Sequence, residues 1–315
     1  MKKLSLAAAA LFAAIFLYGQ EKVRFIPAWI PQAQFAGFYM AQEKGFYAEE
    51  GLDVEILNLS INSSANPLEA LAAGEIDICT AQLVQALIAR SQGYPCVNIL
   101  QTSQNNSLLC ISHTPVKDVS DLDGLRIARW KSGHGEHADM ACREYGVEPK
   151  WEYTLNGINL FISKAVDAMI AYRFSEYLQL LFAKGEIPAE NVIDFGKVGF
   201  NFPEDAVFAS EKFYKEHKDA AVKFACASIR GWQYAAAHRE ETVDVVIRYA
   251  RESNNSTNHA MQKMMLDEIL DSQIDRESGK PTFSHIDMES FALMNQELSA
   301  IGLIDKPVNY NDFIK

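Results

Sequence analysis

The sequence of 315 residues lacks clustered basic residues, closely spaced cysteines and a second long apolar run. Its 29 Lys and Arg residues are outnumbered by 41 Asp and Glu residues, and the longest basic cluster is the pair Lys2 and Lys3. A protein that binds duplex nucleic acid needs clustered cations to displace counterions. The formal net charge of -12 therefore argues against nucleic acid as a partner.

The five cysteines are widely separated in the sequence. Because their number is odd, at least one thiol has no disulfide partner within the chain. We interpret them as small, buried apolar residues. The sequence contains no CxxC pair, no GxSxG turn and no Ser-His-Asp spacing typical of a hydrolase. We therefore expect no catalytic residues, no cofactor and no enzyme activity, although a site assembled from distant residues would leave no linear motif.

The one long apolar run lies at the N-terminus. Lys2 and Lys3 precede an apolar stretch at residues 4–18, and the small residue Gly19 follows it, which is typical of a secretory signal peptide at residues 1–20. The stretch has about 15 residues, fewer than the roughly 20 that span a bilayer. The first cysteine is Cys79, so a lipid anchor is not expected at the processed end. Loss of Lys2 and Lys3 changes the charge from -12 to -14, and we expect a soluble, exported mature chain.

From residue 21 onward, short β-branched or aromatic runs alternate with helical patterns, which predicts parallel sheets crossed by helices. Strands are expected at 23–27, 53–57, 76–80, 97–100, 109–112, 125–128, 151–154 and 168–172. Helices are expected at 35–44, 67–73 and 83–92, each ending at a glycine suited to the left-handed conformation. Beyond Phe208 we expect only long helices, at 211–238, 240–252, 258–273 and 288–301.

Two units of this chain resemble each other. GEIDICTAQLVQAL and KAVDAMIAYRFSEYL place Asp77 and Asp167 at the head of a short strand that runs straight into a helix. Ligands of open α/β sheets bind at the carboxyl ends of such strands. Polar linkers at 101–108 and 196–205 fall where the chain would cross between units. We expect a discontinuous first lobe of residues 21–103 and 205–315 and a second lobe of residues 104–204.

The segment WIPQAQFAGFYMAQEKGFYAEEGLDVEI, residues 29–56, resembles the opening signature of the periplasmic substrate-binding proteins of the thiamine-pyrimidine and alkanesulfonate type. LAAGEIDICTAQ, DLDGLRIA, FPEDAVFAS and ASIRGWQYAAAHREETVDVVI are similar to later family segments, in family order. The resemblance implies a two-lobed, type II periplasmic binding protein, each lobe a mixed, mostly parallel sheet flanked by helices. It also implies a ligand cleft between the lobes, two hinge strands, an ABC transporter permease as partner and a monomer.

The chain departs from this family in two places. Lys164 precedes Asp167 where the family has a glycine, and Arg173 and Phe174 replace the usual residues before Glu176. The identity of the ligand is therefore left open. The related fungal enzyme that makes the thiamine pyrimidine carries a dense cysteine cluster, which this sequence does not have.

Candidate ligand-binding residues follow strand ends and loops, where aromatic faces can hold a flat ring and a few polar groups can orient it. Tyr39 lies one turn into its expected helix and would otherwise face the core, while the serines precede a helix start that could equally cap itself. The candidates are Trp29, Gln34, Phe35, Tyr39, Ser63, Ser64, Gln82, Trp130, Tyr172, Glu176, Asn201 and Phe202.

Tyr172 and Glu176, in the segment YRFSEY at residues 172–177, are placed at the ligand by the resemblance alone. A buried carboxylate is costly unless it is paired, so an amine-bearing or cationic ligand fits Glu176 better than a sulfonate does; the alternative is an acid that favours a helix N-terminus. His134 and His137 are three residues apart rather than four, so no metal site is expected. We expect a binding protein for a flat heterocycle such as a thiamine pyrimidine precursor. The alternatives are an alkanesulfonate-binding protein, a pyrimidine-synthase-like enzyme and a ligand-sensing module.

Overall fold

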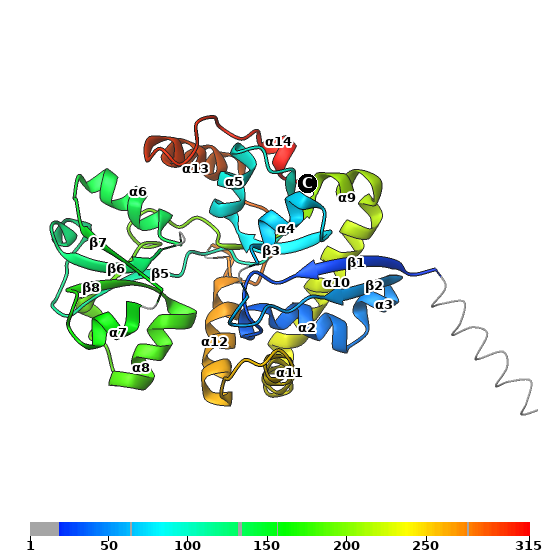
Figure 1. Ribbon diagram of the computed structural model, residues 1–315, viewed down its shortest axis with the longest axis horizontal. Coiled ribbons are helices and arrows are strands. Elements are labelled where there is room, and N and C mark those ends of the chain that lie inside the picture. The colour runs from blue at the N-terminus through cyan, green and yellow to red at the C-terminus, as the bar shows by residue number, and fades with distance from the viewer. Residues whose placement is uncertain (1–18, 64, 132–133, 156, 276) are drawn as a thin grey trace, which may run out of the picture.

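The computed structural model describes residues 19–63, 65–131, 134–155, 157–275 and 277–315, in which two five-stranded sheets lie side by side along the long axis (Figure 1). The unit built on the first sheet is called lobe 1, and the unit built on the second is called lobe 2. The first sheet, in the order β2-β1-β3-β10-β4, consists of β1 (Glu21–Ile26), β2 (Leu52–Ile56), β3 (Ile78–Gln82), β4 (Cys96–Gln101) and β10 (Asp205–Ser210). The second, in the order β7-β6-β8-β5-β9, consists of β5 (Leu108–Ser112), β6 (Arg126–Trp130), β7 (Lys150–Thr154), β8 (Ala168–Tyr172) and β9 (Val192–Asp194).

Both sheets are mixed, as expected. β1 is parallel to β2 and β3, and β6 is parallel to β7 and β8, whereas β10 and β5 run antiparallel to both of their neighbours. All eight expected strands form within two residues of their expected bounds. The sequence did not predict β9 or β10, and the expectation that only helices follow Phe208 was wrong, because β10 continues to Ser210 inside the first sheet and is buried along Ala206–Ser210. A central strand has no polar alternation to mark it in the sequence.

The helices of lobe 1 cover its sheet and continue to the C-terminus. They are α2 (Ala36–Glu43), α3 (Phe46–Glu49), α4 (Pro67–Ala73), α5 (Leu83–Ser91), α9 (Glu211–Glu216), α10 (Lys218–Ala237), α11 (Arg239–Glu252), α12 (His259–Ser272), α13 (Met288–Ala300) and α14 (Tyr310–Phe313). The helix expected at 211–238 is split between α9 and α10 at His217, whose φ of -133° is not helical. Lobe 2 carries α6 (Glu136–Tyr145), α7 (Gly157–Ile162), a π-helical turn (Arg173–Tyr177) and α8 (Leu178–Lys184).

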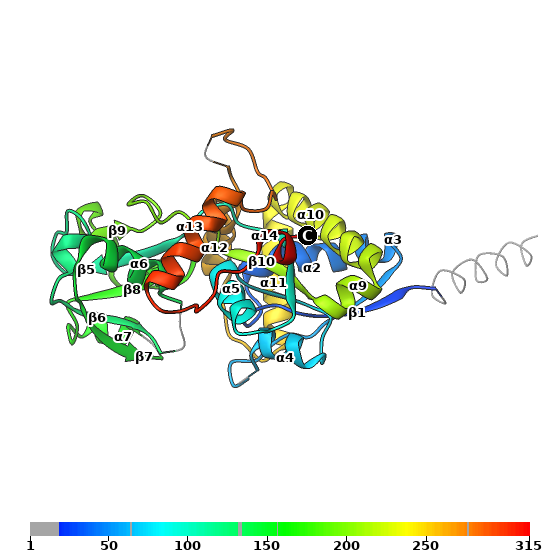
Figure 2. The ribbon, with the colours of Figure 1, turned by 90° about the horizontal axis from the view of Figure 1, so that it is seen from above.

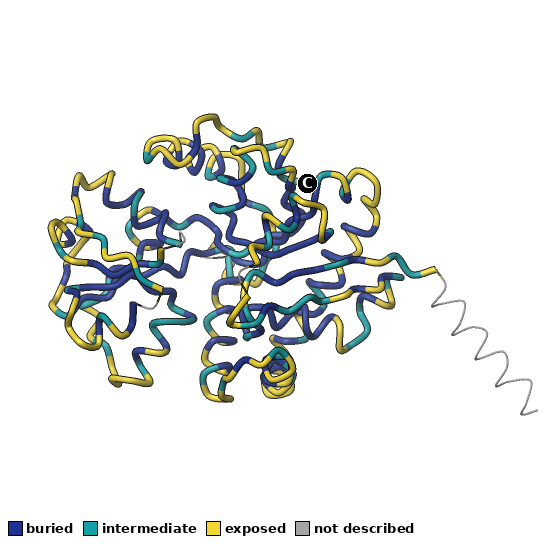
Figure 3. The backbone as a smooth tube through the Cα atoms, viewed as in Figure 1, coloured by how far each residue is buried: buried dark blue, intermediate teal, exposed yellow. Residues whose placement is uncertain are grey.

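The core of lobe 1 depends on the close crossing of α10 over α2. A Cβ atom on Gly231 would lie 2.0 Å from the carbonyl oxygen of Gly37, so glycine is required where the two backbones meet. Beside this crossing, the ring of Phe224 lies 5.1 Å from that of Phe25 and 5.0 Å from that of Tyr47. The buried segments in the middle of each lobe coincide with the strands (Figure 3).

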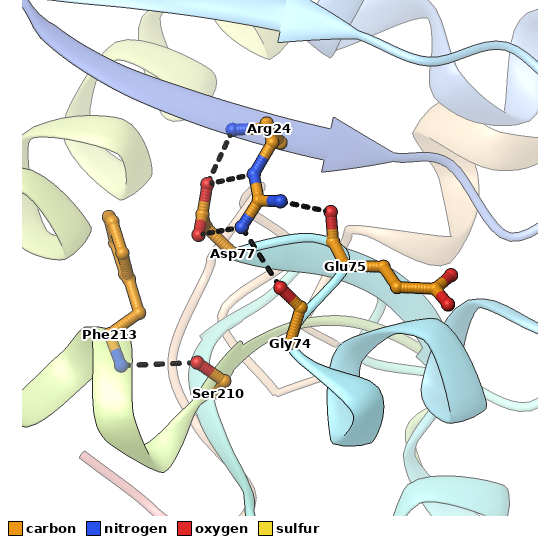
Figure 4. A network of polar contacts seen from close by, with 6 residues as sticks. All are labelled: Arg24, Gly74, Glu75, Asp77, Ser210 and Phe213. Atoms are coloured by element: carbon orange, nitrogen blue, oxygen red, sulfur yellow. Dashed lines mark hydrogen bonds and ion pairs between the residues drawn. The ribbon is translucent and has the colours of Figure 1, made fainter.

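The two lobes contain the same pattern of hydrogen bonds between an arginine and an aspartate, which confirms that the units around Asp77 and Asp167 correspond. In lobe 1, Arg24 donates to the Asp77 carboxylate from its backbone N–H (2.9 Å), its Nε (3.1 Å) and its Nη2 (2.8 Å), as Figure 4 shows. In lobe 2, Arg126 donates to Asp167 from the same three groups, at 2.8, 3.4 and 3.3 Å. Each Asp thus ties the strand that it begins to the neighbouring parallel strand.

Two chain segments connect the sheets, at 102–107 between β4 and β5 and at 195–204 between β9 and β10. They are bonded to each other, since Asn201 accepts from the backbone N–H of Asn106 (2.9 Å) and donates to Asn105 (3.1 Å). Two helices of lobe 1 also contact lobe 2: α12 packs on the π-helical turn and α8, and α13 packs on α6 (Figure 2). Arg143 of α6 lies 3.5 Å from Glu297 of α13. No helix in the described residues combines the length and apolar character needed to cross a bilayer.

Candidate ligand-binding site between the lobes

A stack of aromatic rings stands at the carboxyl end of the second sheet. Tyr172, the last residue of β8, lies between Trp130, the last residue of β6, and Phe174 of the π-helical turn, with ring centroids 5.1 and 5.2 Å away. The planes are nearly parallel, at 20° and 18°. Parallel strands end at one edge, which is why residues more than 40 positions apart in the sequence meet there. His134 meets the rings of both Trp130 and Tyr172 edge-on.

Lobe 1 reaches this stack through Gln82, the last residue of β3. Its side-chain amide donates to the hydroxyl of Tyr172 and so joins the strand ends of the two sheets. Both residues are buried, each with 8 % of its surface exposed. The aromatic stack therefore lies at the junction of the lobes.

Four carboxyl groups gather around Tyr172. Burial raises the pKa of its hydroxyl well above the ordinary value, and the nearby carboxylates of Glu204, Glu136 and Asp205 raise it further. Glu176 accepts a hydrogen bond from the backbone N–H of Tyr172 at 3.1 Å. We call these acids, together with Gln82, Trp130, His134, Tyr172 and Phe174, the Tyr172 cluster.

Glu204, Glu176 and Asp205 hold their protons unusually tightly. Burial raises the pKa of Glu204 to about 8, that of Glu176 to about 7 and that of Asp205 to about 6. Hydrogen bonds only partly oppose this effect: Ser107 donates to Glu204 at 2.7 Å, and Gln34 donates to Asp205 at 2.9 Å. At neutral pH, Glu204 is therefore mostly a neutral acid.

Several polar atoms of this region have no hydrogen-bond partner in the described part of the chain. They include one carboxyl oxygen of Glu136 and one of Glu204, as well as Nδ1 of His134 and Nε2 of His137. Burial lowers the pKa of His137 to about 4, so its ring is neutral. Buried polar groups without a partner are costly, and a ligand that supplies partners recovers that cost.

No Lys or Arg side chain is bonded to the four acids of the cluster within the described residues. Arg129 acts on Glu136 through its charge, but its guanidinium is held by Asp139, with Nη2 2.9 Å from Oδ2. Arg173, which follows Tyr172, is held by Asp194 at 2.8 Å. The cluster therefore has an excess of acidic groups and suits a ligand that donates hydrogen bonds or carries positive charge.

Of the predicted site residues, Gln82, Trp130, Tyr172 and Glu176 lie together in the Tyr172 cluster, and Gln34 is bonded to it through Asp205. Their contact with a ligand stays a prediction. Asn201 lies in the second connecting segment, where its side chain bonds to the first.

The other candidates lie elsewhere. Phe35 is buried in the core of lobe 1, and so is Tyr39, whose ring stacks on that of Tyr249 at 4.3 Å; the core alternative for Tyr39 is the one that the structure favours. Phe202 is buried beside the ring of His137. Trp29 is 53 % exposed, Ser63 lies in an exposed loop, and Ser64 falls outside the described residues.

Sequence reasoning missed Glu136, Glu204 and Asp205 as residues of the candidate site. The signal was the acidic pair between Pro203 and Ala206, directly before a run of apolar residues. The sequence does not mark that run as a strand, so the pair falls within the linker expected at 196–205. No group of three or more His, Cys, Asp or Glu residues in the described ranges is arranged to hold a metal ion.

The fold and the position of this site define the class: the structure has the two-lobed fold of periplasmic binding proteins. The aliphatic sulphonate binding protein SsuA of Escherichia coli superposes with a TM-score of 0.68, at 17 % identity, over 94 % of this chain and 92 % of that one. Residues 32–242 match the family described as NMT1/THI5 like, so the chain belongs to that family. The resemblance and the fold expected from the sequence are thereby confirmed.

Relatives of known name cover nearly the whole chain. The riboflavin-binding protein RibY of Chloroflexus aurantiacus is 24 % identical over 92 % of this chain and 83 % of its own length. The formylaminopyrimidine-binding protein of Halalkalibacterium halodurans is 22 % identical over 93 % of this chain and 89 % of its own length. A 4-amino-5-hydroxymethyl-2-methylpyrimidine phosphate synthase of Saccharomyces cerevisiae is 22 % identical over 76 % of this chain and 74 % of its own length.

Proposed function

We propose that this protein is an extracytoplasmic solute-binding protein of an ABC importer, and that its lobes enclose a flat heterocycle bearing amine or cationic groups. The observation that carries this proposal is the Tyr172 cluster, where four acids lie around stacked rings and no Lys or Arg of the described residues is bonded to them. Aromatic faces hold a flat ring, and carboxylates accept hydrogen bonds from ring amines. The relatives named for riboflavin and formylaminopyrimidine support a heterocycle, and we favour a pyrimidine precursor of thiamine.

An alkanesulfonate is the weaker candidate. The likeness to SsuA supports the fold, but a sulfonate would bring negative charge toward Glu136 and Asp205. Arg129 and Arg173 are already held by Asp139 and Asp194. Burial of a charge without a partner is unfavourable, so the cluster disfavours an anion.

A binding role without catalysis is supported by the names of RibY and of the formylaminopyrimidine-binding protein. Among the cysteines, Cys79, Cys96, Cys110 and Cys142 are buried, and burial raises the pKa of each thiol, which makes them poor nucleophiles. Because the chain is also similar to the yeast synthase, the absence of catalysis needs a direct test. A pyrimidine incubated with the protein and recovered should have an unchanged mass, and a converted product would identify an enzyme.

Binding would work through closure of the lobes. In this proposal residues 21–103 and 205–315 form one rigid body and residues 104–204 the other, and they move about the paired connecting segments. A ligand that bonds to both lobes stabilises the closed state over the open one. Residues 1–20 act as the export signal, and the mature monomer passes its ligand to a membrane permease. A receptor in place of the permease would make the same closure a sensing event.

The binding proposal is tested by calorimetry on the mature protein with 4-amino-5-hydroxymethyl-2-methylpyrimidine and with butanesulfonate. We expect heat of binding for the pyrimidine and none for the sulfonate. At pH 8.5, where Glu204 is mostly ionised, Glu204→Gln should weaken pyrimidine binding by about 10- to 100-fold, the value of a charge-assisted hydrogen bond. Glu186→Gln, which removes an exposed acid of lobe 2, is the control and should leave binding unchanged. Binding of the sulfonate but not of the pyrimidine would overturn the proposal.

A further inference from the structure

A hollow lies in lobe 1, and none of its lining residues belongs to the Tyr172 cluster. It has a volume of about 440 Å³ and is lined by residues of α10, α11 and α12 and of the segment that follows α12. Its apolar lining includes Trp232, Leu270, Ile274, Pro281 and Phe283. Sites for small molecules are commonly hollows of about 300–1,000 Å³ with mainly apolar walls and a few polar groups. We call this hollow the α10–α12 pocket.

Two residues that line the pocket carry buried donors without a partner. Nε1 of Trp232 and Nε2 of Gln273 have no hydrogen-bond acceptor in the described part of the chain. The two residues are only 1 % and 2 % exposed. Leaving one such donor unsatisfied costs about 1–3 kcal/mol, so a guest that brings an acceptor is favoured once the side chain turns its donor toward the hollow.

The charges around the pocket exclude an anionic occupant. Arg239 is the one basic residue in its described lining, and its guanidinium is bound by Asp267 of α12. Asp271 adds a further negative charge to the wall. A carboxylate or phosphate would therefore meet a net negative surface with no cation free to pair with it.

We propose that the α10–α12 pocket binds a neutral, flat compound of one or two rings that carries a carbonyl-type hydrogen-bond acceptor. The apolar wall, to which the Trp232 ring packed on Gly37 belongs, receives the ring of the guest, and the Gln273 amide, once turned toward the hollow, supplies the donor that the acceptor needs. The site shares no residue with the Tyr172 cluster, so it can be filled while the junction of the lobes holds its own ligand. This proposal goes beyond the transport function and does not depend on it.

The probe is quinolin-2-one, a neutral two-ring lactam, titrated into the mature protein by calorimetry and by ligand-observed NMR. Ala236, which lines the pocket from the exposed side of α10, allows it to be filled without disturbing the core. Ala236→Trp should abolish binding, whereas Ala237→Trp, on the next exposed residue, should leave it unchanged. Tyr172→Ala should also leave it unchanged, because that substitution affects only the junction of the lobes.

Two further measurements test the chemistry. Gln273→Leu should weaken binding of quinolin-2-one by about tenfold or less, the value of one neutral hydrogen bond. Quinoline-2-carboxylate should bind at least about tenfold more weakly than the lactam, because the described wall offers no free cation. The proposal is overturned if quinolin-2-one does not bind, if it binds equally to Ala236→Trp, or if its binding is lost in Tyr172→Ala.

Discussion

Lys164 takes a backbone conformation that lysine seldom adopts. Its φ is 58°, in the left-handed region, at the turn that follows α7 and precedes β8. Gly74 occupies the corresponding turn of lobe 1 with a φ of 75°. The backbone hydrogen bonds match as well, since residues 164 and 165 donate to 161 and 160 as residues 74 and 75 donate to 71 and 70. Lys164 therefore keeps the turn that the family glycine would form, but its backbone is strained because a residue with a side chain occupies the left-handed region.

Lys164→Gly should increase the free energy of unfolding by about 1 kcal/mol, because glycine adopts the left-handed region without a steric penalty. The reciprocal substitution Gly74→Lys should lower it by a similar amount. Urea unfolding of both variants provides the measurement. A loss of stability in Lys164→Gly would show that the lysine side chain contributes more than its backbone costs.

Glu204 gives the unliganded protein a dependence of stability on pH. Its pKa in the folded state, about 8, lies above the ordinary value of 4.5, so the folded state holds the proton more tightly than the unfolded state. The contribution of Glu204 to the free energy of unfolding is fully present below about pH 4.5 and is lost as the pH rises toward 8. Glu176 and Asp205 act in the same direction over narrower ranges.

Glu204→Gln should therefore increase the free energy of unfolding at pH 8.5 by about 1–3 kcal/mol and change it little at pH 4.5. The neutral amide keeps an oxygen that can accept from Ser107. Urea unfolding at the two pH values measures the difference, with Glu186→Gln as the control. Equal effects at both values would mean that Glu204 does not titrate in this range.

At the scale of elements, the crossing of α10 over α2 leaves no room for a side chain. A Cβ atom on Gly231 would meet not only the carbonyl oxygen of Gly37 but also Ala41, at 2.8 Å. Backbone atoms cannot yield as the end of a flexible side chain can, so the helices would have to separate. Burial of Trp232, whose ring lies against Gly37, depends on the same crossing.

Gly231→Ala should lower the free energy of unfolding by about 3 kcal/mol or more, at the upper end of the cost of overpacking. Gln233→Ala, on an exposed position of the same helix, should change it by less than about 0.5 kcal/mol. Thermal unfolding of the two variants compares them directly. A Gly231→Ala protein as stable as the parent would mean that the helices cross at a greater distance.

At the scale of the whole molecule, the lobes meet through a few polar contacts at the strand ends and through two helices at the sides. The bond from Gln82 to the Tyr172 hydroxyl joins the sheets directly. The pair of Arg143 and Glu297 joins α6 to α13, but it is partly exposed and contributes little. Closure is therefore sensitive to changes at Tyr172.

Tyr172→Phe should shift the unliganded protein toward the open state and weaken ligand binding by about tenfold or less, because the ring stack remains while one hydrogen bond is lost. Small-angle scattering should show a larger radius of gyration, and calorimetry should show the weaker affinity. Tyr145→Phe, on an exposed tyrosine of α6, serves as the control. An unchanged radius and affinity would show that this bond does not hold the lobes together.

Features that depend on neighbours in sequence could be predicted. The eight expected strands, the glycine turns and the repeat around Asp77 and Asp167 follow from local patterns. Gln82 is a candidate site residue because a parallel strand carries its last residues to the ligand-binding edge, whereas Tyr172 is a candidate through the family resemblance. What only the tertiary structure decided concerns partners far apart in the chain. Tyr39 is buried because Tyr249 stacks on it, and Glu204 joins the site because β10 inserts between β3 and β4. The burial of these side chains and the raised pKa of Glu204 result from that packing, since desolvation depends on every element around a group rather than on its place in the sequence.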